Sequence, residues 1–184
     1  SFGAAVIGRM MEAQGLKVAI VPQPNWQDDL RDFKKLGRPR LFFAVTAGNM
    51  DSMVNHYTAN KRLRSDDAYS PDGKPHFRPD YASVVYCNTL KKLFPDVPIL
   101  LGGIEASLRR FTHYDYWSDK LMPGILFSTK ADLLVYGMGE KPLLAILEEL
   151  KKGKSLRDLQ HIPQTSYLAK EIPEHPKWKT KTLV

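Results

Sequence analysis

Short apolar runs alternate with segments of helical periodicity along most of the chain. The apolar runs predict strands, and they lie at 16–21, 40–46, 97–101, 132–136 and 164–168. Apolar residues recur at helical spacing in the segments between them, namely 1–12, 27–36, 51–57, 80–94, 105–111 and 140–152. The run at 40–46 is apolar without alternation, which is typical of a strand buried on both faces in a parallel sheet. This order predicts an α/β fold, Rossmann-like, with a mostly parallel sheet and flanking helices.

Two segments leave the prediction open. Residues 82–87 fit a strand as well as a helix, but the helical pattern continues to Phe94, so we predict a helix. Residues 58–80 contain few apolar side chains and include the turn 70–73. A stretch of that length without regular structure is either a functional loop or disordered.

Positive charge is concentrated near the end of the chain. The 184 residues carry a formal net charge of +7, and residues 151–184 hold eight basic against three acidic groups. We therefore predict a domain over 1–152, followed by a basic linker or tail over 153–184. A nucleic-acid footprint would instead require a basic face on the folded domain.

The chain contains a single cysteine, Cys87. One thiol forms no internal disulfide and supplies no multi-thiolate metal site. We predict that Cys87 is a buried structural thiol on the helix 80–94. A reducing, cytoplasmic setting follows as the default, and no apolar run approaches the ~18 residues that span a bilayer.

Glycine-bearing turns follow three of the predicted strands, at 46–49, 102–105 and 137–140. The carboxyl ends of parallel strands share one edge, where α/β sheets bind ligands. Glycine there either lets the backbone approach a ligand or only makes a tight turn. The candidate residues of this crevice are Gly48, Asn49, Asp51, Gly102, Gly103, Glu105, Ser107, Gly137, Gly139 and Glu140.

A polar and aromatic cluster follows the second of these turns. Its candidate residues are Arg109, Arg110, His113, Tyr114, Asp115 and Asp119. The histidine and the two aspartates are capable in principle of ligating a metal. The arginines and aromatic rings suit either nucleobase stacking or a domain interface. Nucleotide-binding glycine fingerprints, a P-loop and a hydrolase nucleophile elbow do not occur in the sequence.

Several blocks of this sequence resemble the YgiQ-type radical SAM family. They are Ser1 to Arg9, Gly48 to Asn55, Arg64 to Tyr69, Leu101 to Arg110, His113 to Lys120 and Lys130 to Glu140. The resemblance implies an N-terminal domain similar to the cobalamin-binding-like, Rossmann-type domains that precede radical SAM barrels. In the family, a downstream C-x3-C-x2-C motif holds a [4Fe-4S] cluster that binds S-adenosylmethionine (SAM).

The chain departs from the family pattern in ways that shape the expected function. It has no cluster motif and begins after the family's first strand, so that strand is expected to be absent. The D-x-H-x-x-G motif of cobalamin-binding domains does not occur either, so no cobalamin is expected. We therefore expect an accessory domain that is not catalytic alone, with its own C-terminal barrel as partner and an unknown substrate.

Two alternatives and two residue roles remain as hypotheses. The alternatives are a nucleotide- or corrinoid-binding module without catalysis, and an RNA-contacting domain that uses Lys61, Arg62 and Arg64. We expect Glu105 and Glu140 to cap helix starts at the crevice. We also expect Arg109 or Arg110 to hold an anionic substrate or a domain contact.

Overall fold

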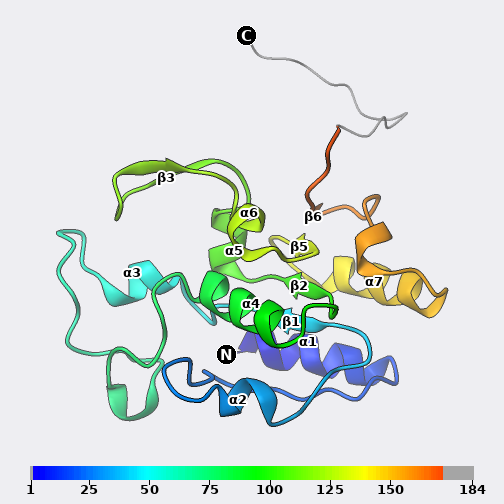
Figure 1. The fold of residues 1–184 in the computed structure, drawn as a ribbon, viewed down its shortest axis with the longest axis horizontal. Coiled ribbons are helices and arrows are strands. Elements are labelled where there is room, and N and C mark those ends of the chain that lie inside the picture. The colour runs from blue at the N-terminus through cyan, green and yellow to red at the C-terminus, as the bar shows by residue number, and fades with distance from the viewer. Residues whose placement is uncertain (1, 172–184) are drawn as a thin grey trace.

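Four strands form the central sheet of this computed structural model, which describes residues 2–171 (Figure 1). They are β1 (Phe43–Val45), β2 (Ile99–Leu101), β5 (Leu133–Val135) and β6 (Thr165–Ser166), in the order β1-β2-β5-β6. The first three strands are parallel, and β6 pairs antiparallel with β5. The predicted α/β class with a mostly parallel sheet is confirmed.

Helices cover both faces of this sheet. The longer ones are α1 (Phe2–Ala13), α4 (Ala82–Leu93) and α7 (Glu140–Lys151), and the shorter ones are α2 (Arg31–Lys34), α3 (Ser52–His56), α5 (Ile104–Leu108) and α6 (Ile125–Thr129). One core cluster joins the sheet to α2, α4, α5 and α6, and a second joins it to α1 and α7. No helix within residues 2–171 is long and apolar enough to cross a membrane.

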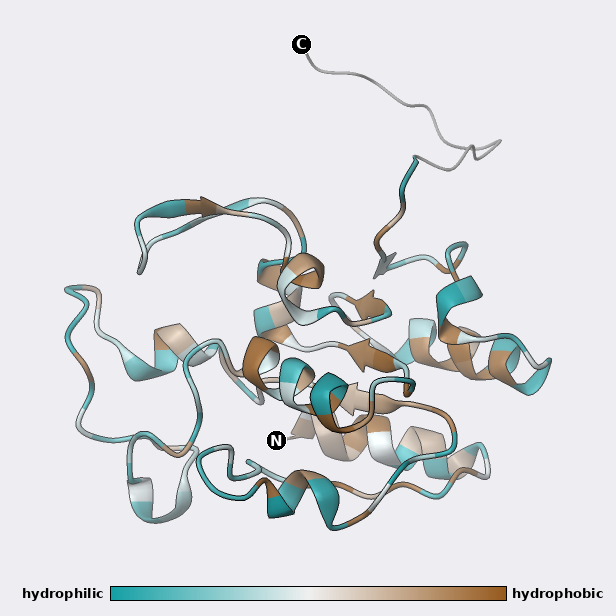
Figure 2. Ribbon diagram, viewed as in Figure 1, coloured by the Kyte–Doolittle hydropathy of each residue, from teal (hydrophilic) through white to brown (hydrophobic). Residues whose placement is uncertain are grey.

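The two clusters explain the apolar runs without alternation. Ile99 and Leu101 belong to the first cluster, whereas Leu100 between them belongs to the second. Successive side chains of a strand point to opposite faces, so a strand covered on both sides is apolar throughout. All three residues of β2 and of β5 are buried, and Figure 2 shows these strands among the most hydrophobic parts of the chain. Burial of each large aliphatic side chain contributes about 1.5–3 kcal/mol.

The strand predicted at 16–21 is wrong. These residues form no β-ladder in the structure. Leu16 and Val18 instead pack against the second core cluster, and Val18 and Ile20 lie beside Gly8 of α1. An apolar run becomes a strand only where a neighbouring strand satisfies its backbone groups, and no neighbour does so within the described residues.

The helix predicted over 27–36 shrinks to the four residues of α2. Three acidic or amide side chains form local turns ahead of it, because Asn25 accepts from the backbone of Gln27, Asp28 from Leu30 and Asp29 from Arg31. Such side chains offer the backbone an alternative to helical hydrogen bonds. By contrast, the helix preferred over a strand at 80–94 is confirmed as α4.

Several elements were not predicted. They are the hairpin β3 (His113–Asp115) and β4 (Lys120–Met122), the helix α6 and the 3-10 turn η2 (Leu156–Asp158). The other 3-10 turn, η1 (Pro71–Gly73), lies in the turn predicted at 70–73. Leu156, Leu159 and Ile162 are buried in the second core cluster. The packed part of the chain therefore continues past the boundary predicted at residue 152, whereas residues 172–184 of the predicted tail lie outside the described residues.

Candidate functional site

The three glycine-bearing turns lie at one edge of the sheet, because the strands before them run parallel. Gly103 has a φ of +88°, and a Cβ atom there would stand 2.3 Å from Oγ1 of Thr46 in the neighbouring turn. The backbone N–H of Gly137 donates to Oγ of Ser107 at 3.1 Å, which joins the third turn to α5. Gly103 is thus required by close packing of the chain against itself.

Glu105 is 1% exposed and connects three helices. Its carboxylate accepts the backbone N–H of Ser52 at 2.8 Å and that of Ser83 at 2.8 Å. These donors lie in the first turns of α3 and α4, so Glu105 stabilises two helix starts other than that of its own helix. Glu140, the other residue expected at a helix start, lies in the first turn of α7.

Arg109 is buried and paired with Asp51. Asp51 also caps α3, because its Oδ1 accepts from the backbone of Met53 and Val54 at 3.0 and 3.2 Å. Burial lowers the pKa of Arg109, and the charge of Asp115 opposes this shift. The guanidinium is therefore engaged within the domain.

Arg110 is only half-buried and lies between two aromatic rings. Its guanidinium carbon is 4.9 Å from the ring centroids of both Phe111 and Tyr136. Its Nη1 donates to the carbonyl of Ser107 at 2.5 Å. Of the two neighbouring arginines, Arg110 is thus the one near the surface at this edge of the sheet, where Asn49 and Gly103 are also exposed.

Asp115 anchors the β3–β4 hairpin to the body of the domain. It is 3% exposed and accepts from the Tyr81 hydroxyl at 2.7 Å, and from the backbone N–H and the hydroxyl of Ser118 at 2.9 and 2.5 Å. Burial raises its pKa, but the hydrogen bonds from Ser118 and Tyr81 outweigh burial and hold the pKa below its ordinary value. Burial and the bond to Asp115 raise the pKa of Tyr81.

The other polar residues of the hairpin do not converge with Asp115. Nδ1 of His113 lies 3.0 Å from the carbonyl oxygen of Phe111, and the Tyr114 hydroxyl donates to Asp119. No set of three His, Cys, Asp or Glu side chains within residues 2–171 is arranged to hold a metal ion.

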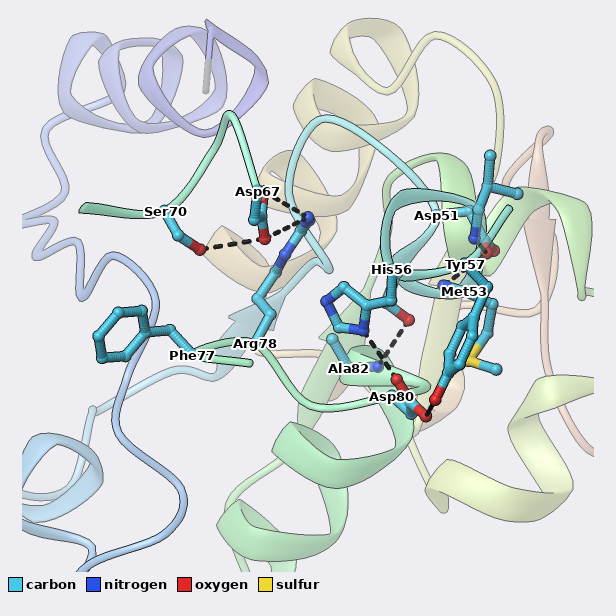
Figure 3. Close-up of polar contacts among 12 residues, drawn as sticks. Asp51, Met53, His56, Tyr57, Asp67, Ser70, Phe77, Arg78, Asp80 and Ala82 are labelled. Atoms are coloured by element: carbon cyan, nitrogen blue, oxygen red, sulfur yellow. Dashed lines mark hydrogen bonds and ion pairs between the residues drawn. The ribbon is translucent and has the colours of Figure 1, made fainter. Parts of the chain in front are cut away.

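Sequence reasoning missed a polar network that fastens the long segment between α3 and α4 (Figure 3). Asp80 accepts from the Tyr57 hydroxyl at 2.6 Å and lies 2.7 Å from Nδ1 of His56. The hydrogen bond to Asp80, followed by burial, raises the pKa of Tyr57 to about 12. Arg78 and Asp67 form a buried ion pair at 3.3 Å.

Residue spacing does not predict this network, because the paired residues are separated by different numbers of residues along the chain. The segment 58–80 has few apolar residues, which predicted a loop but not its anchoring. The available signal was the set of aromatic and charged residues beside the helix starts, such as Tyr57, Arg78 and Asp80. A sequence shows these groups, but only the fold shows which of them meet.

The residues present do not fit the iron–sulfur cluster of radical SAM enzymes. Such a cluster is held by three thiolates, and Cys87 is the single cysteine of the chain. Cys87 is 0% exposed in α4, and burial raises its pKa to about 12. The expectation of a buried thiol on a helix is confirmed, and this thiol is unsuited to metal binding.

Comparisons with known proteins identify the family. Residues 1–183 match the family described as Radical SAM N-terminal, and the chain belongs to this family. It is 65% identical over 180 residues to a UPF0313 protein of Porphyromonas gingivalis, covering 98% of this chain and 27% of the relative. It is 61% identical over 181 residues to a UPF0313 protein of Bacteroides thetaiotaomicron, covering 92% of this chain and 29% of the relative.

A third relative shows a lower identity to this chain. A UPF0313 protein of Methanocella arvoryzae is 53% identical over 172 residues, which cover 94% of this chain and 28% of the relative. The chain thus spans little more than a quarter of the length of these relatives. No solved structure matches the chain.

Proposed function

We propose that the intact protein is a radical SAM enzyme and that this chain is its N-terminal accessory domain. The observation that carries the proposal is the match of nearly the whole chain to a radical SAM N-terminal family whose members extend far beyond it. The [4Fe-4S] cluster and SAM would bind outside this chain, because the chain supplies one buried thiol where three thiolates are needed. The substrate is left unassigned.

The accessory role is to cover the barrel that follows in the same polypeptide. Large apolar side chains are exposed on α5, in the segment that follows it, on α6 and in the turn after β5, namely Leu108, Phe111, Phe127 and Met138. Each of these is at least 59% exposed. Figure 1 shows α5 and α6 close to the end of β5, with the hairpin extending beyond them. Apolar surface of this kind is typical of an interface. We assign as its partner the part of the polypeptide that follows this domain in the longer relatives.

The crevice residues would then face the barrel. The floor of the crevice would consist of Gly48, Asn49, Gly102, Gly103, Gly137 and Gly139. Its rim would be lined by Arg110 and His113, whereas Tyr114 and Asp119, further along the hairpin, would stay uncovered by the barrel. Arg110 is the better candidate for an anionic group, because Arg109 is buried against Asp51. Glu105, Asp51 and Asp115 would position these elements without touching a substrate. Ser107 would hold the third turn beside α5, and Glu140 would lie at the start of α7 next to that turn.

Anaerobic reconstitution with iron and sulfide tests the enzyme class. We expect the full-length protein to bind a cluster and to form 5′-deoxyadenosine from SAM, and this chain to do neither. A full-length protein that binds no cluster would refute the enzyme class.

Two matched substitutions test the docking surface. Leu108→Asp lies in the apolar surface, whereas Leu36→Asp lies beside α2, and both leucines are 59% exposed. We expect the Leu108 variant of the full-length protein to lose 5′-deoxyadenosine formation per cluster and the Leu36 variant to keep it. Equal activity of both variants would contradict the proposed interface.

A further inference from the structure

Two segments that lie far apart in sequence form one projecting unit. We define this aromatic–basic lobe as residues 57–64 and 113–122. The first segment is a tight turn in which Thr58 donates to the carbonyl of Arg62 at 2.8 Å and Lys61 donates to that of Thr58 at 2.9 Å. The second segment is the β3–β4 hairpin. Figure 1 shows both at the same end of the molecule, beyond α3.

Aromatic and cationic side chains join the two segments. The Lys61 ammonium lies 4.7 Å from the ring centroid of Tyr116 and donates to the carbonyl of Trp117 at 3.3 Å. The Trp117 ring lies 5.3 Å from both Tyr57 and Tyr116. The Tyr116 hydroxyl donates to the carbonyl of Ala59 at 2.6 Å. These contacts hold the lobe in a defined shape without closing its outer surface.

The outer surface presents rings and cations together. Residues alternate along the strand β3, so Asp115 points inward while Tyr114 is 58% exposed. Tyr116, directly after the strand, is 47% exposed. Four cations of the lobe are exposed and have no carboxylate partner among residues 2–171, namely Lys61, Arg62, Arg64 and Lys120. The two aspartates of the lobe are already engaged, Asp115 by Tyr81 and Ser118, and Asp119 by Tyr114.

We propose that the aromatic–basic lobe binds single-stranded nucleic acid. Exposed aromatic rings stack bases of any sequence, and unpaired cations beside them neutralise the phosphates. Tyrosine, tryptophan and arginine are also enriched at protein–protein interfaces, but lysine is depleted there. The four clustered cations without a carboxylate partner are what favours a polyanion over a protein partner. The proposal goes beyond the radical SAM assignment and does not depend on it, because binding requires no cluster.

Fluorescence anisotropy of the full-length protein tests the proposal, with a labelled mixed-sequence 16-nucleotide RNA and its duplex as probes. We expect the single strand to bind more tightly than the duplex. If the four cations each neutralise one phosphate, affinity should fall about 50-fold between 50 and 200 mM salt. No binding of the single strand at 50 mM salt would refute the proposal.

Substitutions assign the binding to the lobe. Tyr114→Ala should weaken binding about 5- to 150-fold through loss of one stacked base. The double change Arg62→Ala and Arg64→Ala should reduce the salt slope by about 1.4. Lys17→Ala, an exposed lysine outside the lobe, is the matched control and should leave affinity unchanged.

Three other outcomes would overturn the assignment. Binding that survives the lobe substitutions would place the site elsewhere, for example in the basic segment 151–184. Equal affinity for single strand and duplex would remove the role of stacking. An absence of RNA binding together with a lower unfolding temperature of the lobe variants would identify the lobe as an interface within the protein. Iron content and 5′-deoxyadenosine formation, measured on the same samples, report separately on the enzyme class.

Discussion

Replacement of Glu105 by alanine should be among the most destabilising substitutions in this chain. The carboxylate is 1% exposed and accepts two backbone N–H groups at 2.8 Å each. A hydrogen bond to a charged group contributes about 1.5–3 kcal/mol, and a buried donor left without its acceptor costs a similar amount. Glu105→Ala should therefore lower the free energy of unfolding by about 3–5 kcal/mol, since the loss at Ser52 and Ser83 occurs together.

Urea denaturation of the 184-residue chain, monitored by circular dichroism, measures this change. The m-value of the variant should equal that of the parent, so that a shifted midpoint reports stability. Glu105→Gln keeps one acceptor oxygen and places an amide N–H against the second backbone donor, so it should cost about 2–3 kcal/mol. This variant provides the measurement if the alanine variant does not fold. Glu148→Ala on the exposed face of α7 is the control and should stay within about 0.5 kcal/mol of the parent. A loss below about 1 kcal/mol for Glu105→Ala would refute the assigned role.

Three further predictions concern stability and reactivity. Asp132 accepts from Lys91, Arg157 and the backbone of Ile99; burial raises its pKa, but these partners outweigh burial and lower it. The stabilisation that ionised Asp132 contributes to the fold should therefore be complete above pH 3.8, the ordinary pKa of an aspartate, and should be lost as the pH falls through the lower pKa of the folded state. Asp132→Asn should flatten that part of a plot of unfolding free energy against pH. Gly103→Ala should destabilise the chain by about 2 kcal/mol or more, because it combines a positive φ with a steric clash against the Thr46 side chain. Gly153→Ala is the control in the same denaturation assay. It has a φ of +85° but open space around the new Cβ atom, and should cost about 1 kcal/mol. Cys87 should react with a thiol reagent only when urea unfolds the chain, because burial raises its pKa to about 12, and rapid reaction under native conditions would contradict its position in the core.

Strands and long helices were predictable where local pattern and final environment agree. The apolar residues of β2 and β5 are covered on both faces, as their lack of alternation indicates. The helix α4 follows from spacing that continues over three turns. The run at 16–21 has the same local pattern but forms no ladder, since pairing depends on a neighbouring strand.

The candidate site was predictable in outline only. The position of three turns at one sheet edge follows from parallel pairing, which the order of elements predicts. The order of elements does not predict which side chains are accessible at this edge. Arg109 and Arg110 are adjacent in sequence, yet one is buried against Asp51 and the other lies half-buried between two rings. The hairpin β3–β4 was missed because its residues lack an apolar alternation long enough to predict a strand.

The sequence by itself determined the α/β class, the helical setting of Cys87 and the family, because apolar periodicity, cysteine content and blocks of shared residues are properties of the chain read in order. Only the tertiary structure decided that Glu105 holds the starts of two other helices, that Asp80 joins His56 to Tyr57, and that Lys61 meets Tyr116. The physical reason is that such contacts join groups separated by some 20 to 60 residues. Their formation depends on how the helices and loops pack around the sheet, which local preference does not specify.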